Sequence, residues 1–358
     1  MSLTPKNAKT ATPGSERLIW PELAGFIISY FFSTRQTAHA VRRTGLVLAA
    51  LLLAGRAPAQ TRLGTANPDS MRVVWTDVDQ FWRAFDRLQS ATSTPDSLAV
   101  IEQHYLAVGT PGLRRYAKES NSTATDFLQA IRAHRRYLAA IRPATQSIGQ
   151  HQASIIKAAR QLKKLYPPST FTDLYFVMGK FQVGGTQFDN LLYIGAELKC
   201  SDPQAPLDEL NPMVRGGVTP ASELTTVSIH EMVHAQQPPG RVGTNLELAL
   251  REGAAEYVAY RLTKRLGSPT ALNYGCQHEA TVRQQFAADA QQAPLPKWFL
   301  ATPDPATQAP GALGYFIGFR ICEAYYNEAK DRKAALQTII GLTDTNALLA
   351  RGRKYLGI

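Results

Sequence analysis

Residues 228–256 read SIHEMVHAQQPPGRVGTNLELALREGAAE, and they contain His230, Glu231 and His234 in the spacing HExxH. Side chains four residues apart lie on one face of a helix, so both imidazoles can reach one Zn²⁺ ion. Glu231 is then placed to act as a general base toward the water that attacks a substrate. A catalytic zinc takes three protein ligands. Glu252, which opens the segment EGAAE, is the predicted third ligand.

The surrounding sequence predicts two helices joined by a short turn. Residues 223–237 carry apolar side chains at helical spacing, and the segment Pro-Pro-Gly at 238–240 ends that helix. A second helix is expected to begin at Thr244 or Asn245, both of which are good N-terminal caps. It is expected to run to about Leu266, because Gly267 and Pro269 are stop signals.

The second helix carries two glutamates on one face. Glu252 and Glu256 are four residues apart, so one can bind zinc while the other accepts the free ring N–H of a ligand histidine. Glu256 is the predicted orienting residue, since such a carboxylate fixes the tautomer of the imidazole. The plain alternative to the whole pattern is a surface helix with incidental His and Glu residues.

HExxH followed by a glutamate on the next helix resembles the gluzincin metallopeptidases. Residues 250–260, LREGAAEYVAY, are similar to the LNEGxxxY pattern of the aminopeptidase-N-like branch. Within residues 171–326, and specifically around these two motifs, the chain resembles a family of predicted bacterial secreted zinc-dependent proteases. This resemblance implies a zincin-like catalytic core, Zn²⁺ as cofactor, and peptides or proteins as substrates. It also implies an oxyanion donor downstream of the glutamate ligand, for which Tyr315 is the first candidate and Tyr257, Tyr260 and His278 are rivals.

Two segments ahead of the HExxH helix are expected to form a small sheet, which a gluzincin would need. Residues 171–178 read as a strand, and residues 181–194 read as a strand, a turn at Gly184-Gly185 and a further strand. The edge strand could pair with an extended peptide, main chain to main chain, or could be an ordinary hairpin packed on helices. The two glycines also permit close backbone approach. Glu197, which resembles the IGAE segment of the same family, is expected to be an exposed structural carboxylate.

The rest of the chain is predicted to be mainly helical, which gives an α+β class. Amphipathic segments are expected at 75–88, 98–108, 127–141 and 148–165, with a helix start at 93–96 and a turn at 110–112. We therefore predict a helical N-terminal region, 60–168, and a metallopeptidase core, 169–358. Within that core, residues 276–290, 313–326 and 334–358 are expected to be helical and residues 294–310 to be a proline-rich loop.

The start of the chain carries a processing signal. Residues 41–59 combine a charged Arg42-Arg43 pair, an apolar stretch and an Ala-x-Ala cleavage pattern, as in a secretory signal peptide. Residues 1–40 would then be a start-site extension. An N-terminal membrane anchor is the alternative, which the apolar patch at 26–32 supports. The signal predicts export to the periplasm or the extracellular space.

Composition narrows the class of partner. The formal net charge is +11, of which the first 60 residues contribute +5, and no basic run has interleaved aromatics. A nucleic-acid partner is therefore not expected. The basic face of 148–165 suits a solvated surface and leaves contact with a membrane surface open. Cys200, Cys276 and Cys322 allow one disulfide at most, and either a Cys200–Cys276 bridge or three buried free thiols is consistent with the sequence.

The function predicted is zinc-dependent hydrolysis of peptide bonds, with Glu231 as general base and the zinc held by His230, His234 and Glu252. An alternative from another class is a non-proteolytic, zinc-stabilised binding or scaffold protein of the cell envelope. An amide or ester hydrolase with the same metal chemistry is a third interpretation.

Overall fold

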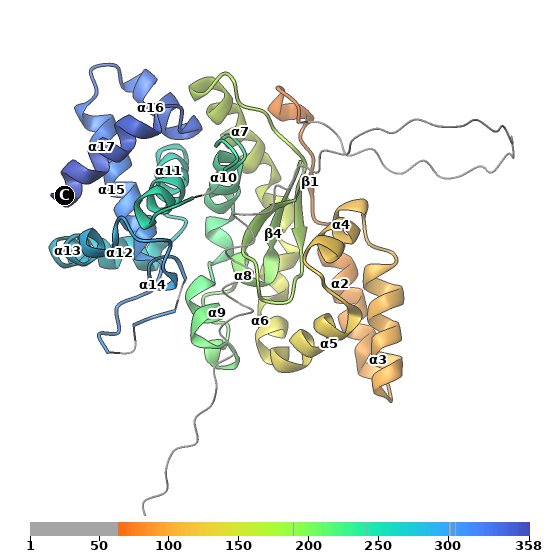
Figure 1. Cartoon of the computed structure of the whole chain (residues 1–358). Coiled ribbons are helices and arrows are strands. Elements are labelled where there is room, and N and C mark those ends of the chain that lie inside the picture. Colours follow the sequence, from red (N-terminus) through yellow and green to blue (C-terminus); the bar gives the residue numbers. More distant parts are fainter. Residues whose placement is uncertain (1–63, 189, 241, 301, 305) are drawn as a thin grey trace, which may run out of the picture. The chain divides into compact units, whose positions relative to one another are not determined.

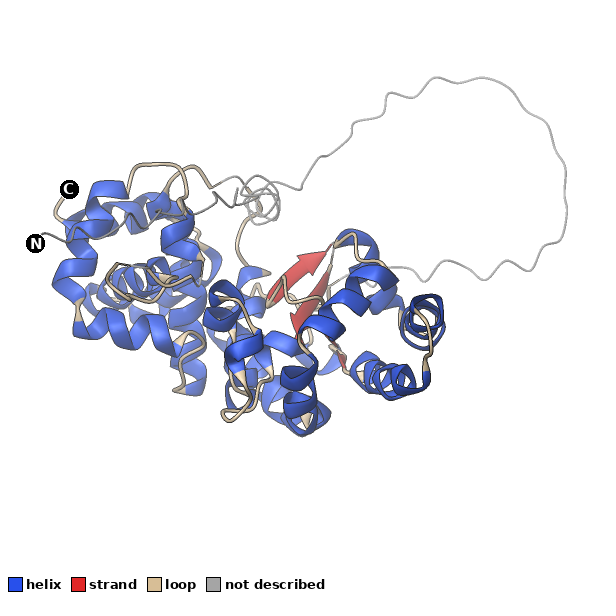
Figure 2. Ribbon diagram, turned by 90° about the horizontal axis from the view of Figure 1, so that it is seen from below, coloured by secondary structure: helices blue, strands red, loops and turns tan. Residues whose placement is uncertain are grey.

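The computed structural model describes residues 64–358 except 189, 241, 301 and 305, so the predicted signal segment and the extension before it lie outside the described residues. Helices predominate, and one small four-stranded sheet lies among them (Figures 1 and 2). The predicted class, α+β and mainly helical, is confirmed. Among the described helices, none combines the length and apolar character needed to cross a membrane.

The chain between β1 (Val73–Val74) and β2 (Leu174–Val177) is mainly helical, as the amphipathic pattern predicts. Its helices are α2 (Thr76–Arg87), α3 (Thr94–Ile101), α4 (Pro111–Glu119), α5 (Ala124–Ala133), α6 (Arg135–Gln146) and α7 (Gln152–Leu165). A π-helical turn, η3 (Glu102–Leu106), prolongs α3, and short 3-10 turns lie at η1 (Pro68–Ser70), η2 (Leu88–Ser90) and η4 (Ile148–His151). The predicted start at 93–96 is confirmed, because the Ser93 side chain accepts a hydrogen bond from the backbone N–H of Asp96.

Two expectations in this region were wrong. Residues 110–112 do not form a turn: the Thr110 side chain accepts from the N–H of Leu113 and caps α4, and Pro111 fills the first helical position. The segment 127–141 is not one helix either. His134 leaves the helical conformation, with φ −127° and ψ 35°, and its ring Nδ1 lies 3.0 Å from the backbone oxygen of Glu209.

The sheet has the order β1 (Val73–Val74), β2 (Leu174–Val177), β4 (Leu191–Gly195) and β3 (Gly185–Phe188). β1, β2 and β4 are parallel, and β3 pairs antiparallel with β4 at the edge. Every residue of β2 and of β4 is buried, as expected for strands covered on both faces. Gly184-Gly185 is not the predicted turn, because Gly185 begins β3 and pairs with Ile194.

The chain after the sheet forms the second group of helices. They are α8 (Ala196–Lys199), α9 (Pro212–Gly217), α10 (Leu224–His234), α11 (Asn245–Thr263), α12 (Pro269–Gln277), α13 (Glu279–Asp289), α14 (Pro296–Phe299), α15 (Leu313–Glu328), α16 (Arg332–Gly341) and α17 (Thr345–Leu356), with 3-10 turns η5 (Leu207–Glu209) and η6 (Ala221–Glu223). The predicted cap is confirmed, since Thr244 and Glu247 form a reciprocal capping box at the start of α11. Pro269 begins α12, while α11 already ends at Thr263, before the predicted end at about Leu266, and Lys264 after it has a left-handed backbone.

Helix α10 is central to the arrangement of these elements. It packs against β3 and β4 and also against α11, and α11 packs along α15 (Figure 1). The α11–α15 contact is made backbone to backbone. A Cβ added to Gly318 would overlap the carbonyl group of Ala249, and one added to Gly253 would overlap the backbone of Gly318. The two glycines therefore set how closely these helices approach.

All three cysteines are free thiols. Cys200 and Cys322 are buried, whereas Cys276 is exposed in α12. The Cys200–Cys276 bridge is therefore absent, and the alternative of three buried thiols is also wrong, because Cys276 faces solvent.

Candidate metal centre

Helix α10 presents two histidines one turn apart. His230 is buried and His234 half-buried, and their Nε2 atoms lie 2.9 Å from each other. The two rings meet edge to face, with centroids 4.6 Å apart. The HExxH spacing therefore brings both imidazoles to one point, as the helical period predicts.

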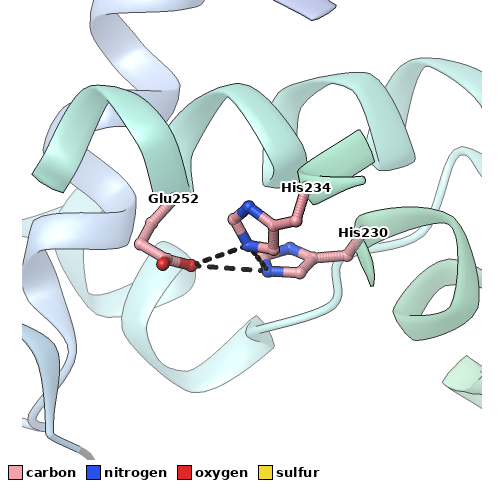
Figure 3. Close-up of side chains that lie close together, drawn as sticks. All are labelled: His230, His234 and Glu252. Atoms are coloured by element: carbon pink, nitrogen blue, oxygen red, sulfur yellow. Dashed lines mark hydrogen bonds and ion pairs between the residues drawn. The ribbon is translucent and has the colours of Figure 1, made fainter. Parts of the chain in front are cut away.

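Helix α11 brings a carboxylate to the same point. Oε2 of Glu252 lies 3.2 Å from Nε2 of His234 and 3.5 Å from Nε2 of His230. Figure 3 shows the Glu252 side chain directed at the facing edges of the two rings. His230, His234 and Glu252 each offer one atom that can bind a metal ion, and in the described part of the chain these atoms all lie within 4.8 Å of one another.

The donor set fits a zinc ion in both chemistry and spacing. Two imidazole nitrogens and one carboxylate oxygen are the ligands of many catalytic zinc sites. Bonds of about 2.0–2.2 Å at tetrahedral angles place ligand atoms about 3.3 Å apart. The three separations found here, 2.9, 3.2 and 3.5 Å, bracket that value. A buried group that could hold a metal ion is therefore present, and with three protein ligands a fourth position is left for water or substrate.

The pKa values of His230 and Glu252 are shifted in directions that favour positive charge at this point. Burial alone would lower the pKa of His230, but its hydrogen bond to Glu252 and the charges of Glu256 and Glu231 raise that pKa to about 9. Burial would likewise raise the pKa of Glu252, yet the charges of His234 and His230 hold it well below its usual range. The site is therefore one of concentrated negative charge, which a divalent cation would neutralise.

Glu231 lies beside this group, and its carboxylate packs against Gly185 of the edge strand β3. It is buried, and a Cβ added to Gly185 would overlap its carboxylate and lie 2.9 Å from its Cγ. Gly185 thus leaves the space that the Glu231 carboxylate occupies. Burial raises the pKa of Glu231, while the charges of His230 and His234 oppose that rise. A carboxylate with a raised pKa is suited to accept and return a proton.

Each of the two histidines has a neighbour on its other ring nitrogen. Nδ1 of His234 lies 2.8 Å from Oε1 of Gln237, whose amide in turn donates to the carbonyl oxygen of Arg251. Nδ1 of His230 lies 3.7 Å from Oε1 of Glu256, which is ion-pair range but too long for a hydrogen bond. The structure thus places Glu256 beside His230, but without the hydrogen bond that the sequence predicts.

Glu256 is itself held in place. Its carboxylate accepts hydrogen bonds from the hydroxyl of Ser268 at 2.5 Å and from the backbone N–H of Gly267 at 3.2 Å. Among the described residues, Nδ1 of His230 has no hydrogen-bond partner. Glu256 therefore acts on His230 through its charge, whereas Gln237 contacts His234 at hydrogen-bond distance.

Tyr315, the first candidate for the oxyanion donor, lies at the site. Its ring is nearly parallel to that of His230, at 15°, with centroids 6.1 Å apart. Burial and the charges of Glu252, Glu256 and Glu231 raise its pKa well above the ordinary value, so the phenol keeps its proton. It is therefore a hydrogen-bond donor close to the predicted ligands.

The rival donors contact other side chains. Tyr257 packs against Phe319 and accepts a hydrogen bond from Arg261, and Tyr260 also packs against Phe319. His278 packs against Tyr274, with ring centroids 4.2 Å apart and the rings tilted by 34°. Of the four candidates, Tyr315 is the one that stacks on a predicted zinc ligand.

Two residues near the site, Gln237 and Lys199, were not predicted from the sequence. Gln237 follows His234 by three residues, a helical spacing that could have identified it. Lys199, at the end of α8, has no such sequence signal. Its ammonium group donates to the carbonyl oxygen of Gly217 at 2.9 Å and to the hydroxyl of Thr219 at 3.3 Å, and it lies in the field of Glu231 and Glu256.

The expectation that Glu197 is exposed was wrong. Its side chain is fully buried, and its carboxylate accepts hydrogen bonds from the backbone N–H groups of Gly179 and Phe181, at 2.8 and 3.2 Å. Phe181 has a left-handed backbone with φ 63°. Burial raises the pKa of Glu197 to about 7. Through these hydrogen bonds, Glu197 fixes the loop that leads from β2 into β3.

Comparisons with models of known protein families, with curated proteins and with solved structures find no match to this chain. The interpretation of the site therefore depends on its own geometry and chemistry.

Proposed function

We propose that the chain is a zinc-dependent peptidase with a zincin-like catalytic core, 169–358. The observation that carries this proposal is the convergence of His230, His234 and Glu252 at tetrahedral spacing, with the carboxylate of Glu231 beside them against an edge strand. A group that only held a structural metal would have no need of a buried carboxylate in that position. The edge strand β3 supplies backbone groups to which an extended peptide can pair.

His230, His234 and Glu252 would hold the ion, and a bound zinc would polarise the scissile carbonyl and lower the pKa of water to about 7. Glu231 takes a proton from the attacking water and returns it to the leaving amine. The phenol of Tyr315 donates a hydrogen bond to the oxygen that gains negative charge. Gln237 and Glu256 orient the two imidazoles through their Nδ1 atoms.

A peptide-library cleavage assay of the zinc-loaded full chain, with and without chelator, tests this proposal. The Glu231→Gln variant should bind zinc as the native chain does and lose peptide hydrolysis, because an amide cannot accept the proton. Glu102→Gln, the same change at an exposed site far along the chain from the motif, is the matched control. Zinc binding without cleavage of any peptide by the native chain would favour the scaffold alternative. Full activity of Glu231→Gln would refute the assignment of the base.

We further propose that the protein is exported, on the basis of the signal-like segment 41–59 in the sequence. Mass spectrometry of the N-terminus of the native protein tests this, and a mature chain that retains residues 1–40 would contradict it.

A further inference from the structure

Lys199 carries a cation beside the edge strand, and it has no role in the reaction proposed above. Its side chain is half-buried, and both acceptors of its ammonium group, the carbonyl of Gly217 and the hydroxyl of Thr219, are uncharged. Within the described part of the chain, no carboxylate lies in ion-pair distance of it. An ammonium group has three N–H donors, so one donor is left over.

The backbone of two consecutive glycines places this cation close to the catalytic base. A Cβ added to Gly184 would overlap Cε of Lys199 and lie 3.2 Å from Nζ, and a Cβ added to Gly185 would overlap the carboxylate of Glu231. Because consecutive Cα atoms lie about 3.8 Å apart, Nζ of Lys199 and the carboxylate of Glu231 are at most roughly 12 Å apart. The base and the cation are therefore neighbours at the start of β3.

Charge supports the same placement. Burial lowers the pKa of Lys199, while the carboxylates of Glu231 and Glu256 oppose that fall. A cation that is partly desolvated and lacks its own counter-ion gains most from an anion that a ligand brings. Since an extended chain advances about 3.3–3.6 Å per residue, an anion at Lys199 would lie within about three residues of a bond held beside Glu231.

We propose that Lys199 binds a carboxylate of the substrate, so that peptides with a carboxylate within about three residues of the scissile bond are preferred. This inference rests on the proposed peptidase function and names its substrate class. The carboxylate has two sources, the C-terminus of a peptide or an Asp or Glu side chain. Lys199 would act in binding and leave the proton transfers to Glu231.

Binding to the zinc-loaded, full-length Glu231→Gln chain tests the proposal without turnover. Two pairs of fluorescent peptides serve as probes, one pair with a free or an amidated C-terminus and one pair with internal Glu or Gln. We expect the acid of at least one pair to bind about tenfold tighter or more than its neutral partner, because a charge-assisted hydrogen bond is at stake. The pair that shows the difference identifies the source of the carboxylate. This comparison needs no substitution at Lys199, so it does not depend on a variant that folds.

In the same background, Lys199→Met should bring the acid-to-neutral ratio close to one. Lys157→Met, at an exposed lysine of α7, should leave the ratio as it was. A purely structural role of Lys199, as a link to Gly217 and Thr219, would weaken both members of a pair equally and keep the ratio, and this result would overturn the proposal. Equal binding of acid and neutral peptides by the parent chain would overturn it as well.

The two proposals fail in distinguishable ways. An acid preference in binding, with no cleavage by the native chain, would count against the peptidase and not against Lys199. Cleavage of peptides without an acid preference in either pair would overturn the assignment of Lys199 alone.

Discussion

Gly185→Ala is the substitution that most directly tests how the site is built. Gly185 is the first residue of β3, and its missing side chain leaves room for the carboxylate of Glu231. Alanine keeps the strand conformation available and adds one methyl group. That methyl group would overlap the carboxylate and lie 2.9 Å from Cγ of Glu231. The side chain of Glu231 must therefore move, while the zinc ligands need not.

The size of the effect follows from the overlap. Carbon atoms in contact prefer separations of about 3.5–4.0 Å, so the Glu231 carboxylate has to move by roughly 1 Å or more. A misplacement of about 1 Å in a catalytic group costs about 10²-fold in rate. We therefore expect kcat to fall about 100-fold, while zinc affinity stays within a few-fold of the native value, because His230, His234 and Glu252 are not displaced.

The assay is hydrolysis of a peptide from the library screen by the zinc-loaded full chain, together with zinc titration and thermal unfolding. Gly217→Ala is the matched control, because a Cβ at Gly217 would meet no atom within 4 Å. If Gly185→Ala retained kcat within a few-fold of Gly217→Ala at equal zinc occupancy, the reasoning that β3 fixes the position of Glu231 would be refuted. Loss of zinc together with activity would also contradict it.

Four further outcomes are expected. Gln237→Ala should weaken zinc binding about 10- to 100-fold by releasing the ring of its histidine partner, as a competition titration would show; an unchanged affinity would contradict this. Apparent zinc affinity should rise about tenfold per pH unit up to roughly pH 9, because zinc must displace the proton from His230, whose pKa is raised to about 9; a pH-independent affinity would be inconsistent with that. Gly318→Ala should lower the free energy of unfolding by about 2–3 kcal/mol, measured in urea, because a methyl group there overlaps the backbone of α11. Burial raises the pKa of Glu197 in the folded chain to about 7, so between about pH 4.5 and 7 the native chain binds more protons than the unfolded chain. The free energy of unfolding, measured relative to Glu197→Gln, should therefore fall by up to about 3 kcal/mol as pH rises through this range and then level off. Free energies of unfolding that change in parallel with pH in the two chains would refute this.

The helical elements of the site could be predicted because their signals are local. The HExxH spacing and the N-terminal cap at Thr244 each act within one or two turns of chain, although α10 ends at His234, before the stop expected at Pro238. The turn expected at Gly184-Gly185 failed for the opposite reason. Glycine permits a turn but does not require one, and here the two glycines make room for Lys199 and Glu231, which arrive from α8 and α10.

Glu197 shows the same limit for burial. A charged residue after a strand is most often exposed, and no pattern around it indicates otherwise. It is buried because a left-handed residue, Phe181, and Gly179 direct their N–H groups at its carboxylate from another part of the chain. Such pairing depends on the path of the β2–β3 loop and not on any local preference.

The sequence by itself indicated the candidate metal-binding residues, the carboxylate of Glu231 beside them and the mainly helical class, because the helical period converts spacing in the chain into position on a face. Tertiary structure alone decided that Glu252 meets the imidazoles at 3.2 and 3.5 Å, that Gly185 makes room for the carboxylate of Glu231, and that both acceptors of the Lys199 ammonium group are uncharged. These are contacts between segments that share no spacing in the chain. Their geometry is set by how helices and strands pack, so it became visible only once the chain was folded.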